Sequence, residues 1–191
     1  MNKKIFFSIL VSGCLILFPA LMNAQRGEGT KLLQRIRPSG DSVVSMIPKK
    51  ILQQLATVSA AGGQRLIIFG ASAVTKQASM LWLAKKWGKE VYRVDLSEVV
   101  SKYIGETEKN LDLIFNDQKA RDNILFFDEG DELFGNRTHV SDSHDKYANQ
   151  EVAYLLSRIE NYQGLLALAL NYNSKADSDF IRRFRYIIKA N

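Results

Sequence analysis

The sequence predicts an α/β fold in which helices cover both faces of a five-stranded parallel sheet. Short apolar runs bounded by polar residues indicate strands that are buried on both faces. Segments with a helical spacing of apolar residues separate these runs, and this alternation is typical of a parallel sheet. The expected strands span residues 65–69, 90–95, 123–127, 165–170 and 186–189.

The helices are expected before and between these strands. A leading helix is expected over residues 49–61, and a second helix over 78–87 follows a predicted loop at 70–77. Two later helices are marked by apolar residues that recur on one face. These residues are Leu111, Ile114 and Phe115 in the first of them, and Val152, Leu155, Leu156 and Ile159 in the second.

Length and composition suit one folded domain. The chain has 191 residues, and domains typically run to ~100–200 residues. The net charge of +6 comes from basic residues that are dispersed among acids, so we expect a mixed solvated surface and no specific nucleic-acid partner. His139 and His144 are too isolated to favour a metal site. The single cysteine, Cys14, cannot form an intramolecular disulfide.

The N-terminus predicts a targeting segment over residues 1–24. A short basic start precedes an uncharged apolar run at 5–22, the shape of a signal peptide that would export the domain after cleavage at Ala24. The alternative is membrane attachment through an uncleaved anchor with a cytoplasmic domain, because basic residues also follow the run closely. We favour the signal peptide. Glycines and prolines then indicate a flexible connector over 25–48.

The apolar run at 124–127 leads directly into two adjacent carboxylates, Asp128 and Glu129. Open α/β sheets bind ligands at the carboxyl ends of their strands, so this pair is expected at the mouth of a site. In nucleotide hydrolases the first such carboxylate holds Mg²⁺ and the second orients the attacking water. An alternative interpretation is that both acids begin the next helix, where negative charge suits the helix dipole.

Several further blocks, in their order along the chain, resemble the core of an AAA ATPase, a P-loop NTPase-like three-layer sandwich. These are 94–97, then 101–109 (pore loop and following helix), 124–129 (Walker B strand), 168–171 (sensor 1 strand) and 180–184 (arginine-finger segment). The resemblance identifies residues 49–191 as an AAA-type core domain. It therefore implies a fold, a cofactor and a set of site residues.

The implied cofactors are ATP and Mg²⁺. Gly70, Thr75, Lys76 and Gln77 correspond to the phosphate-binding Walker A loop, and Asp128 completes the cofactor-binding set. Asp128 and Gln77 are the implied metal ligands. Lys76 would meet a β- or γ-phosphate as a point charge.

The resemblance also implies catalytic and substrate-binding roles. Glu129 would orient water, Asn171 would contact the water or the γ-phosphate, and Arg182 or Arg183 would act on a neighbouring subunit of a homo-oligomeric ring. Tyr103 would face the central pore and grip a protein substrate. In the alternative interpretations, Asn171 closes a turn, the arginines complement a helix end, and Tyr103 covers the sheet edge.

The Walker A loop departs from the family pattern. Ala73 and Thr75 replace glycines, and Gln77 replaces the residue whose hydroxyl binds the metal. Thr75 is β-branched and resists the backbone conformations that glycine tolerates, and Gln77 would have to fold back to reach a metal. The chain also ends at Asn191 directly after the fifth expected strand, so we expect no C-terminal helical lid.

These observations leave three functions open. The favoured one is ATP binding and hydrolysis by an AAA-type core, in the service of protein remodelling. The alternative is a degenerate, non-hydrolysing AAA module that acts as a protein-interaction domain. A third interpretation is an exported structural domain that binds no nucleotide.

Overall fold

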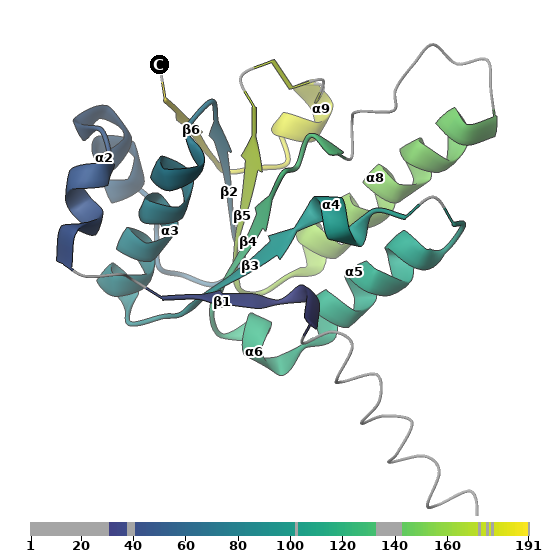
Figure 1. Ribbon diagram of the computed structural model, residues 1–191, viewed down its shortest axis with the longest axis horizontal. Coiled ribbons are helices and arrows are strands. Elements are labelled where there is room, and N and C mark those ends of the chain that lie inside the picture. The colour runs from purple at the N-terminus through teal and green to yellow at the C-terminus, as the bar shows by residue number, and fades with distance from the viewer. Residues whose placement is uncertain are drawn as a thin grey trace, which may run out of the picture.

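The computed structural model describes residues 31–37, 41–101, 103–132, 143–171, 173, 174, 176 and 178–190. These residues form an α/β fold around one sheet, seen near the centre of Figure 1. Its strands are β1 (Gln34–Ile36), β2 (Gln64–Phe69), β3 (Val91–Asp95), β4 (Ile124–Asp128), β5 (Leu165–Leu170) and β6 (Tyr186–Lys189). Their order in the sheet is β1-β3-β4-β5-β2-β6, and all of these strands except β1 run parallel.

The sheet has six strands within the described residues, so the prediction of five was wrong. The additional strand, β1, pairs antiparallel with β3 and places Gln34 opposite Arg93. It lies in the segment 25–48, which the sequence predicted to be a flexible connector. The 3₁₀ helix η1 (Asp41–Met46) lies in the same segment and contacts α3. Part of the expected connector is therefore built into the fold.

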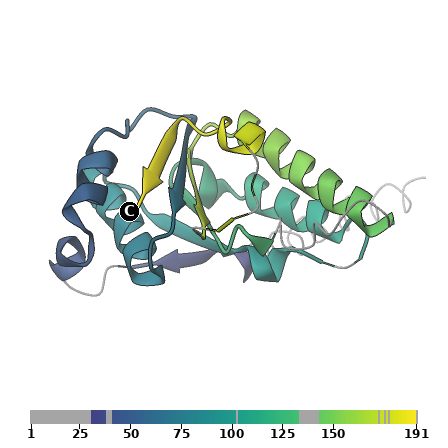
Figure 2. The same ribbon diagram turned by 90° about the horizontal axis from the view of Figure 1, so that it is seen from above.

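Helices cover both faces of the sheet, which gives the predicted three layers (Figure 2). They are α2 (Lys49–Ala56), α3 (Ala73–Trp87), α4 (Leu96–Val99), α5 (Glu106–Asn116), α6 (Gln118–Arg121), α8 (Ser143–Asn161) and α9 (Ser178–Ile181). Side chains that alternate along each strand enter two separate cores. Phe126 packs in the core under α2 and α3, and Phe127 packs in the core under α5 and α8. This arrangement explains why β5 is apolar at every position and β4 at every position before Asp128.

Helix α3 begins at Ala73, which corrects the expectation of a loop as far as residue 77. Ser72 is extended and caps the helix, because its side chain accepts a hydrogen bond from the backbone N–H of Thr75. Gly88 ends the helix in the left-handed conformation, with φ of 64°. Thr75, Lys76 and Gln77 are consequently helical residues rather than loop residues.

The structure corrects the expected end of the leading helix, and several predicted residues lie outside the described ranges. The leading helix ends at Ala56 rather than at residue 61. Residues 1–30 and His139 lie outside the described residues, and His144 lies in α8 rather than in a loop. Within the part of the chain that is described, no helix combines the length and the apolar content needed to cross a bilayer.

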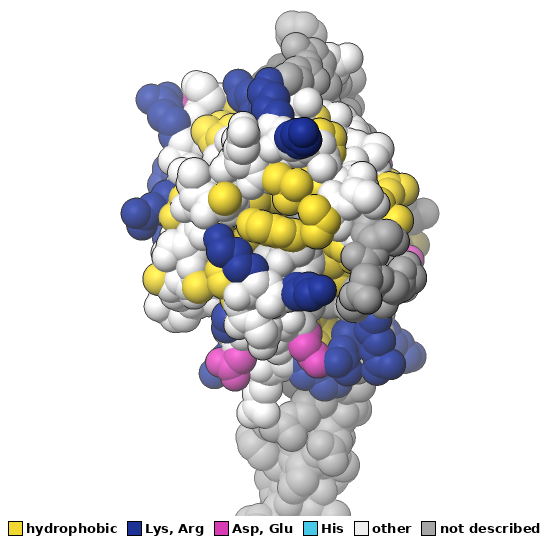
Figure 3. Space-filling view, turned by 90° about the vertical axis from the view of Figure 1, so that its left-hand side faces the viewer, with side chains coloured by type: hydrophobic (Ala, Val, Ile, Leu, Met, Phe, Trp, Pro, Cys, Tyr) yellow, Lys and Arg dark blue, Asp and Glu magenta, His cyan; other side chains and the backbone are white. Residues whose placement is uncertain are grey.

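The side of the molecule that carries α2 and α3 has a mixed surface (Figure 3). Apolar side chains gather near the middle of this face, and lysines and arginines lie around them. A groove of about 520 Å³ lies between the N-terminal segment and α3 and is lined by both kinds of residue, including Val44, Trp82 and Lys85.

Candidate functional site

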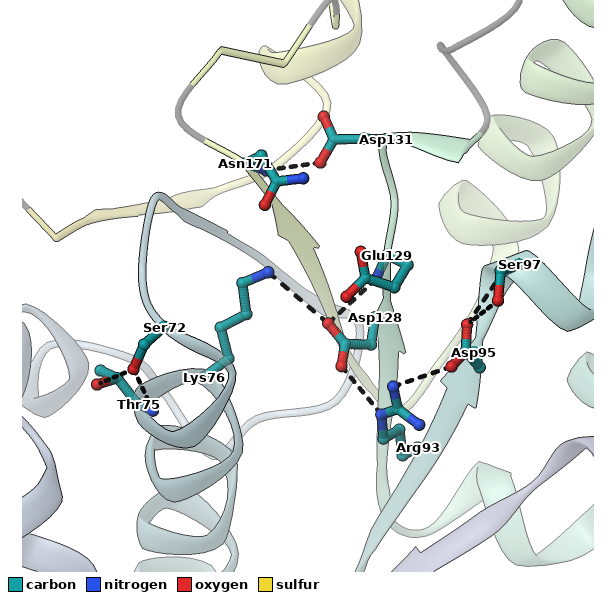
Figure 4. Close-up of polar contacts among 10 residues, drawn as sticks. All are labelled: Ser72, Thr75, Lys76, Arg93, Asp95, Ser97, Asp128, Glu129, Asp131 and Asn171. Carbon is teal, nitrogen blue, oxygen red and sulfur yellow. Dashed lines mark hydrogen bonds and ion pairs between the residues drawn. The ribbon is translucent and has the colours of Figure 1, made fainter.

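The carboxyl ends of three neighbouring strands meet at one edge of the sheet. Strand β4 ends at Asp128, β5 is followed by Asn171, and β2 is followed by Gly70 and then by α3. Because β5 lies between β4 and β2, the residues after these strands converge, as Figure 4 shows. This is the edge at which open α/β sheets bind ligands.

A buried ion pair joins α3 to the end of β4. The Nζ of Lys76 lies 3.8 Å from the Oδ1 of Asp128, and their side chains are only 5% and 8% exposed. Lys76 extends from the second turn of α3 toward the strand end (Figure 4). Buried charged side chains in proteins are usually paired, and this pair links α3 to the end of β4.

Arg93, on β3, binds the same carboxylate from the other side. Its Nε donates to the Oδ2 of Asp128 at 2.9 Å, and its Nη2 donates to the Oδ2 of Asp95 at 3.0 Å. Sequence reasoning missed this residue. The signal that could have identified it is a charged side chain in the middle of a strand whose neighbours are apolar.

These contacts change the ionisation of the residues involved. Burial alone would lower the pKa of Arg93, but the hydrogen bonds and charges of Asp128 and Asp95 outweigh it and raise the pKa. Burial alone would raise the pKa of Asp95, but hydrogen bonds from Ser97 and the charge of Arg93 lower it. Asp95 and Arg93 are therefore both charged at neutral pH.

The turn after β4 has an unusual backbone conformation at Glu129. Glu129 has a positive φ of 54°, which is uncommon for a residue other than glycine. Gly130 follows and lies against β5, since its N–H donates to the carbonyl of Ala169 at 3.0 Å. A Cβ at Gly130 would lie 2.8 Å from that carbonyl oxygen. The close packing of Gly130 against β5 thus holds Glu129 in a strained backbone conformation. Such strain is typical of functional sites.

Asn171 is held beside this turn. Its backbone N–H donates to the Oδ2 of Asp131 at 2.6 Å, which links the end of β5 to the residues that follow β4 (Figure 4). The structure therefore brings together Lys76, Asp128, Glu129 and Asn171, four of the predicted site residues.

Residues 66–191 match the sequence model of the ATPase family associated with various cellular activities, AAA. The chain belongs to the AAA family. It is 28% identical to cell division protein C of Sulfolobus acidocaldarius over 129 residues, which are 63% of this chain and 34% of that protein. It is 36% identical to the proteasome-associated ATPase of Thermobifida fusca over 95 residues, which are 44% of this chain and 16% of that protein.

A third relative is the ATPase family gene 2 protein of Schizosaccharomyces pombe, 29% identical over 119 residues, which are 62% of this chain and 15% of that protein. The chain therefore covers 34% or less of the length of each of these relatives. The matches share an ATPase-type core with it, and whole-protein activities do not follow from them.

In this AAA core, the segment predicted to be the Walker A loop is folded into a capped helix start. The N–H of Thr75 donates to the Oγ of Ser72 at 3.2 Å, and the hydroxyl of Thr75 donates to the carbonyl of Met46 at 3.3 Å. Gly70 has a positive φ of 66°, and its N–H donates to the carbonyl of Leu170. Two amides that a phosphate-binding loop could present are thus bonded within the protein.

The residues present fit the phosphates of a nucleotide better than they fit a magnesium ion. Lys76 and the N-terminus of α3 supply positive charge at the strand ends. Gln77 is exposed on α3 and brings no hydroxyl, while Asp128 is already bonded to Arg93. Within the described residues, no three His, Cys, Asp or Glu side chains are grouped as a metal site would require.

The remaining predicted residues lie on the surface of the AAA core. Tyr103 is 60% exposed in the segment between α4 and α5. Arg182 and Arg183 follow α9, where Arg182 pairs with Asp179 and Arg183 pairs with Glu160. An arginine finger acts on a neighbouring subunit, so an exposed position before β6 is compatible with that prediction.

Proposed function

We propose that this AAA core binds ATP at the carboxyl edge of its sheet and hydrolyses it. The observation that carries the proposal is the pairing of Lys76 with Asp128, with Glu129 next in the chain. A lysine at the start of a helix and a carboxylate at the end of a buried strand are the two charged elements that such a reaction needs. Membership of an ATPase family supports the same activity.

In the proposed reaction a water oxygen attacks the γ-phosphorus. The bond from that phosphorus to the bridging oxygen breaks, and ADP and phosphate leave. Glu129 orients the water and accepts its proton, and Lys76 stabilises the negative charge on the phosphate oxygens. The side-chain amide of Asn171 holds the water or a γ-phosphate oxygen. Arg182 or Arg183 completes the site from a neighbouring subunit of a homo-oligomeric ring.

The proposed substrate of such a ring is a protein. One relative is named as a proteasome-associated ATPase, which supports a role in protein handling. Tyr103 and Ile104 are exposed together, at 60% and 76%, and offer the apolar contact with which a pore would grip an extended chain.

The test is a titration of the full-length protein with a fluorescent ATP analogue, followed by measurement of phosphate release. Glu129→Gln should abolish turnover and leave binding unchanged, because only the water-orienting carboxylate is lost. Glu132→Gln is the matched control, since Glu132 is exposed three residues further on. Turnover that survives in Glu129→Gln would show that the activity arises elsewhere.

A second candidate function is a non-hydrolysing AAA module that binds a partner protein. The observation that favours it is the bonding of Thr75 to Ser72 and Met46, which uses the amide and hydroxyl of the phosphate loop within the protein. The combined change Ala73→Gly, Thr75→Gly and Gln77→Thr rebuilds the family pattern. It should strengthen ATP binding if the site is still used. An unchanged affinity favours the partner-binding module.

We also propose that residues 1–24 are a signal peptide that exports the domain. N-terminal sequencing of the mature protein tests this, because cleavage after Ala24 leaves a chain that begins at Gln25. A chain that begins at Gln25 would favour the non-hydrolysing module, because an exported domain would meet little ATP. An intact Met1 on membrane-bound protein would instead identify an anchor and a cytoplasmic domain, and would favour the active ATPase.

A further inference from the structure

Asp128 has a partner at each carboxylate oxygen. Oδ1 accepts the N–H of Glu129 at 3.0 Å and lies 3.8 Å from Lys76, and Oδ2 accepts the Nε of Arg93 at 2.9 Å. The side chain of Asp128 is only 8% exposed. A divalent cation that bound this carboxylate directly would lie close to the positive charges of Lys76 and Arg93, which would repel it.

Arg93 is held in place from two directions. Its Nε binds Asp128 and its Nη2 binds Asp95, so the planar guanidinium spans the ends of β3 and β4 (Figure 4). The register of the strands places Asp95 directly opposite Asp128. Asp95 is itself fixed, because its Oδ1 accepts the N–H of Ser97 at the start of α4. A guanidinium fork with two fixed carboxylates loses little further freedom on binding them.

Within the cluster of Lys76, Arg93, Asp95 and Asp128 the charges balance without a metal ion, and Glu129 adds one negative charge beside the cluster. Lys76 and Arg93 each contribute one positive charge, and Asp95 and Asp128 each contribute one negative charge. A site that requires a divalent cation is instead expected to present carboxylates without a permanent cation on them. Gln77 removes the hydroxyl that would otherwise bind the metal. The cations beside the carboxylates and the missing hydroxyl at Gln77 both weaken the binding of a divalent metal ion.

We propose that the Arg93 guanidinium takes the place of the divalent cation at Asp128, so that this chain binds a nucleoside triphosphate without requiring Mg²⁺. The inference rests on the proposed nucleotide binding. Arg93 cannot lose its charge in the accessible pH range and has five N–H donors, so it can neutralise a phosphate oxygen while it holds the two carboxylates. Arg93 is then a positioning residue for Asp128 and a binding residue for the triphosphate.

The first experiment compares the affinity of the full-length protein for N-methylanthraniloyl-ATP in EDTA and in excess Mg²⁺. We expect the two dissociation constants of the wild type to agree within about threefold, which corresponds to a small difference in binding free energy. Arg93→Gln should gain a preference of about tenfold for the Mg²⁺ form, since a charge-assisted hydrogen bond no longer occupies Asp128. Arg35→Gln is the matched control, because Arg35 lies on the adjacent strand and pairs with Glu90.

The second experiment needs no nucleotide. Mn²⁺ binding, measured by electron paramagnetic resonance, should be weak in the wild type and about tenfold tighter in Arg93→Gln. Equal Mn²⁺ affinity in both proteins would overturn the inference. Loss of nucleotide binding by the wild type in EDTA would also overturn the inference. This measurement uses the wild type alone and so does not depend on whether a variant folds. Absence of nucleotide binding in every condition would defeat the proposed function instead, while the Mn²⁺ comparison still decides the role of Arg93.

Discussion

The Oγ of Ser72 accepts the backbone N–H of Thr75 at 3.2 Å and closes the first turn of α3. An amide at this point of the chain would face the phosphates in a Walker A loop, and here it is bonded within the protein. The same side chain thus has two consequences. The Ser72 side chain starts α3 earlier than the family pattern implies. It also occupies the N–H of Thr75, which could otherwise bind a phosphate.

Removal of this cap should destabilise the protein measurably. Ser72→Ala is expected to lower the free energy of unfolding by about 1 kcal/mol, because the backbone N–H of Thr75 loses its hydrogen-bond acceptor at the helix start. Ser72→Gly should cost only a few tenths of a kcal/mol, since glycine is itself tolerated at the N-cap. Urea denaturation of the two variants and the wild type measures both differences. Equal stability of Ser72→Ala and the wild type would show that the hydroxyl does not hold the turn.

The backbone strain at Glu129 predicts an unusual order of stabilities. Glu129→Gly should be more stable than Glu129→Ala by about 1 kcal/mol, although glycine usually costs stability, because φ at this residue is 54°. Both changes remove the carboxylate, so each serves as the control for the other. Chemical denaturation gives the difference. If Glu129→Ala were equally stable, the turn would have relaxed to a negative φ.

The contact between Gly130 and β5 predicts a large cost for a single methyl group. Gly130→Ala is expected to lower the free energy of unfolding by about 1–3 kcal/mol, since its Cβ would lie 2.7 Å from Leu170 and 2.8 Å from the carbonyl oxygen of Ala169. Gly88→Ala is the control, because a Cβ there meets no atom within 4 Å and only the positive φ opposes it. Thermal unfolding compares the two. A smaller loss of thermal stability in Gly130→Ala than in Gly88→Ala would contradict the predicted crowding around Gly130.

The buried strands could be predicted from the sequence because each contains a short apolar run bounded by polar residues. The expected ranges 165–170 and 186–189 agree with β5 and β6, and the other three differ from the structure by a residue at one or both ends. Strand β1 was missed since Gln34–Ile36 is only three residues long and two of them are exposed. Its place in the sheet depends on pairing with β3, which local pattern does not encode.

The candidate site could be predicted only in part. Lys76, Asp128 and Glu129 lie at one edge of the sheet, because strand ends fix where such residues lie, and the roles that the resemblance implies for them stay predictions. The bond between Arg93 and Asp128 joins residues that are 35 apart in the chain. It depends on the register of β3 against β4, and a one-residue slip would have moved Arg93 to the other face of the sheet.

Tyr162 predicts how stability changes in alkaline solution. Its ring is buried beside α5 and α6, and its hydroxyl donates to the carbonyl of Ala120. Burial, with a smaller contribution from the charge of Asp122, raises the pKa of Tyr162 above its ordinary value. The unfolded chain therefore loses this proton at a pH of about 10, while the folded protein keeps it.

The stabilisation by Tyr162 is therefore fully present below pH 10 and is lost as the pH rises toward the folded-state pKa. Its loss should follow a slope of about 1.4 kcal/mol per pH unit, because one proton separates the two states. Tyr162→Phe lacks both the hydrogen bond and the ionisation. We expect it to be less stable than the wild type by about 1 kcal/mol at pH 7, and this difference should shrink and then reverse above pH 10. Urea denaturation of both proteins between pH 7 and 11 measures it. Parallel stability curves would mean that the Tyr162 hydroxyl ionises as readily in the folded protein as in the unfolded chain.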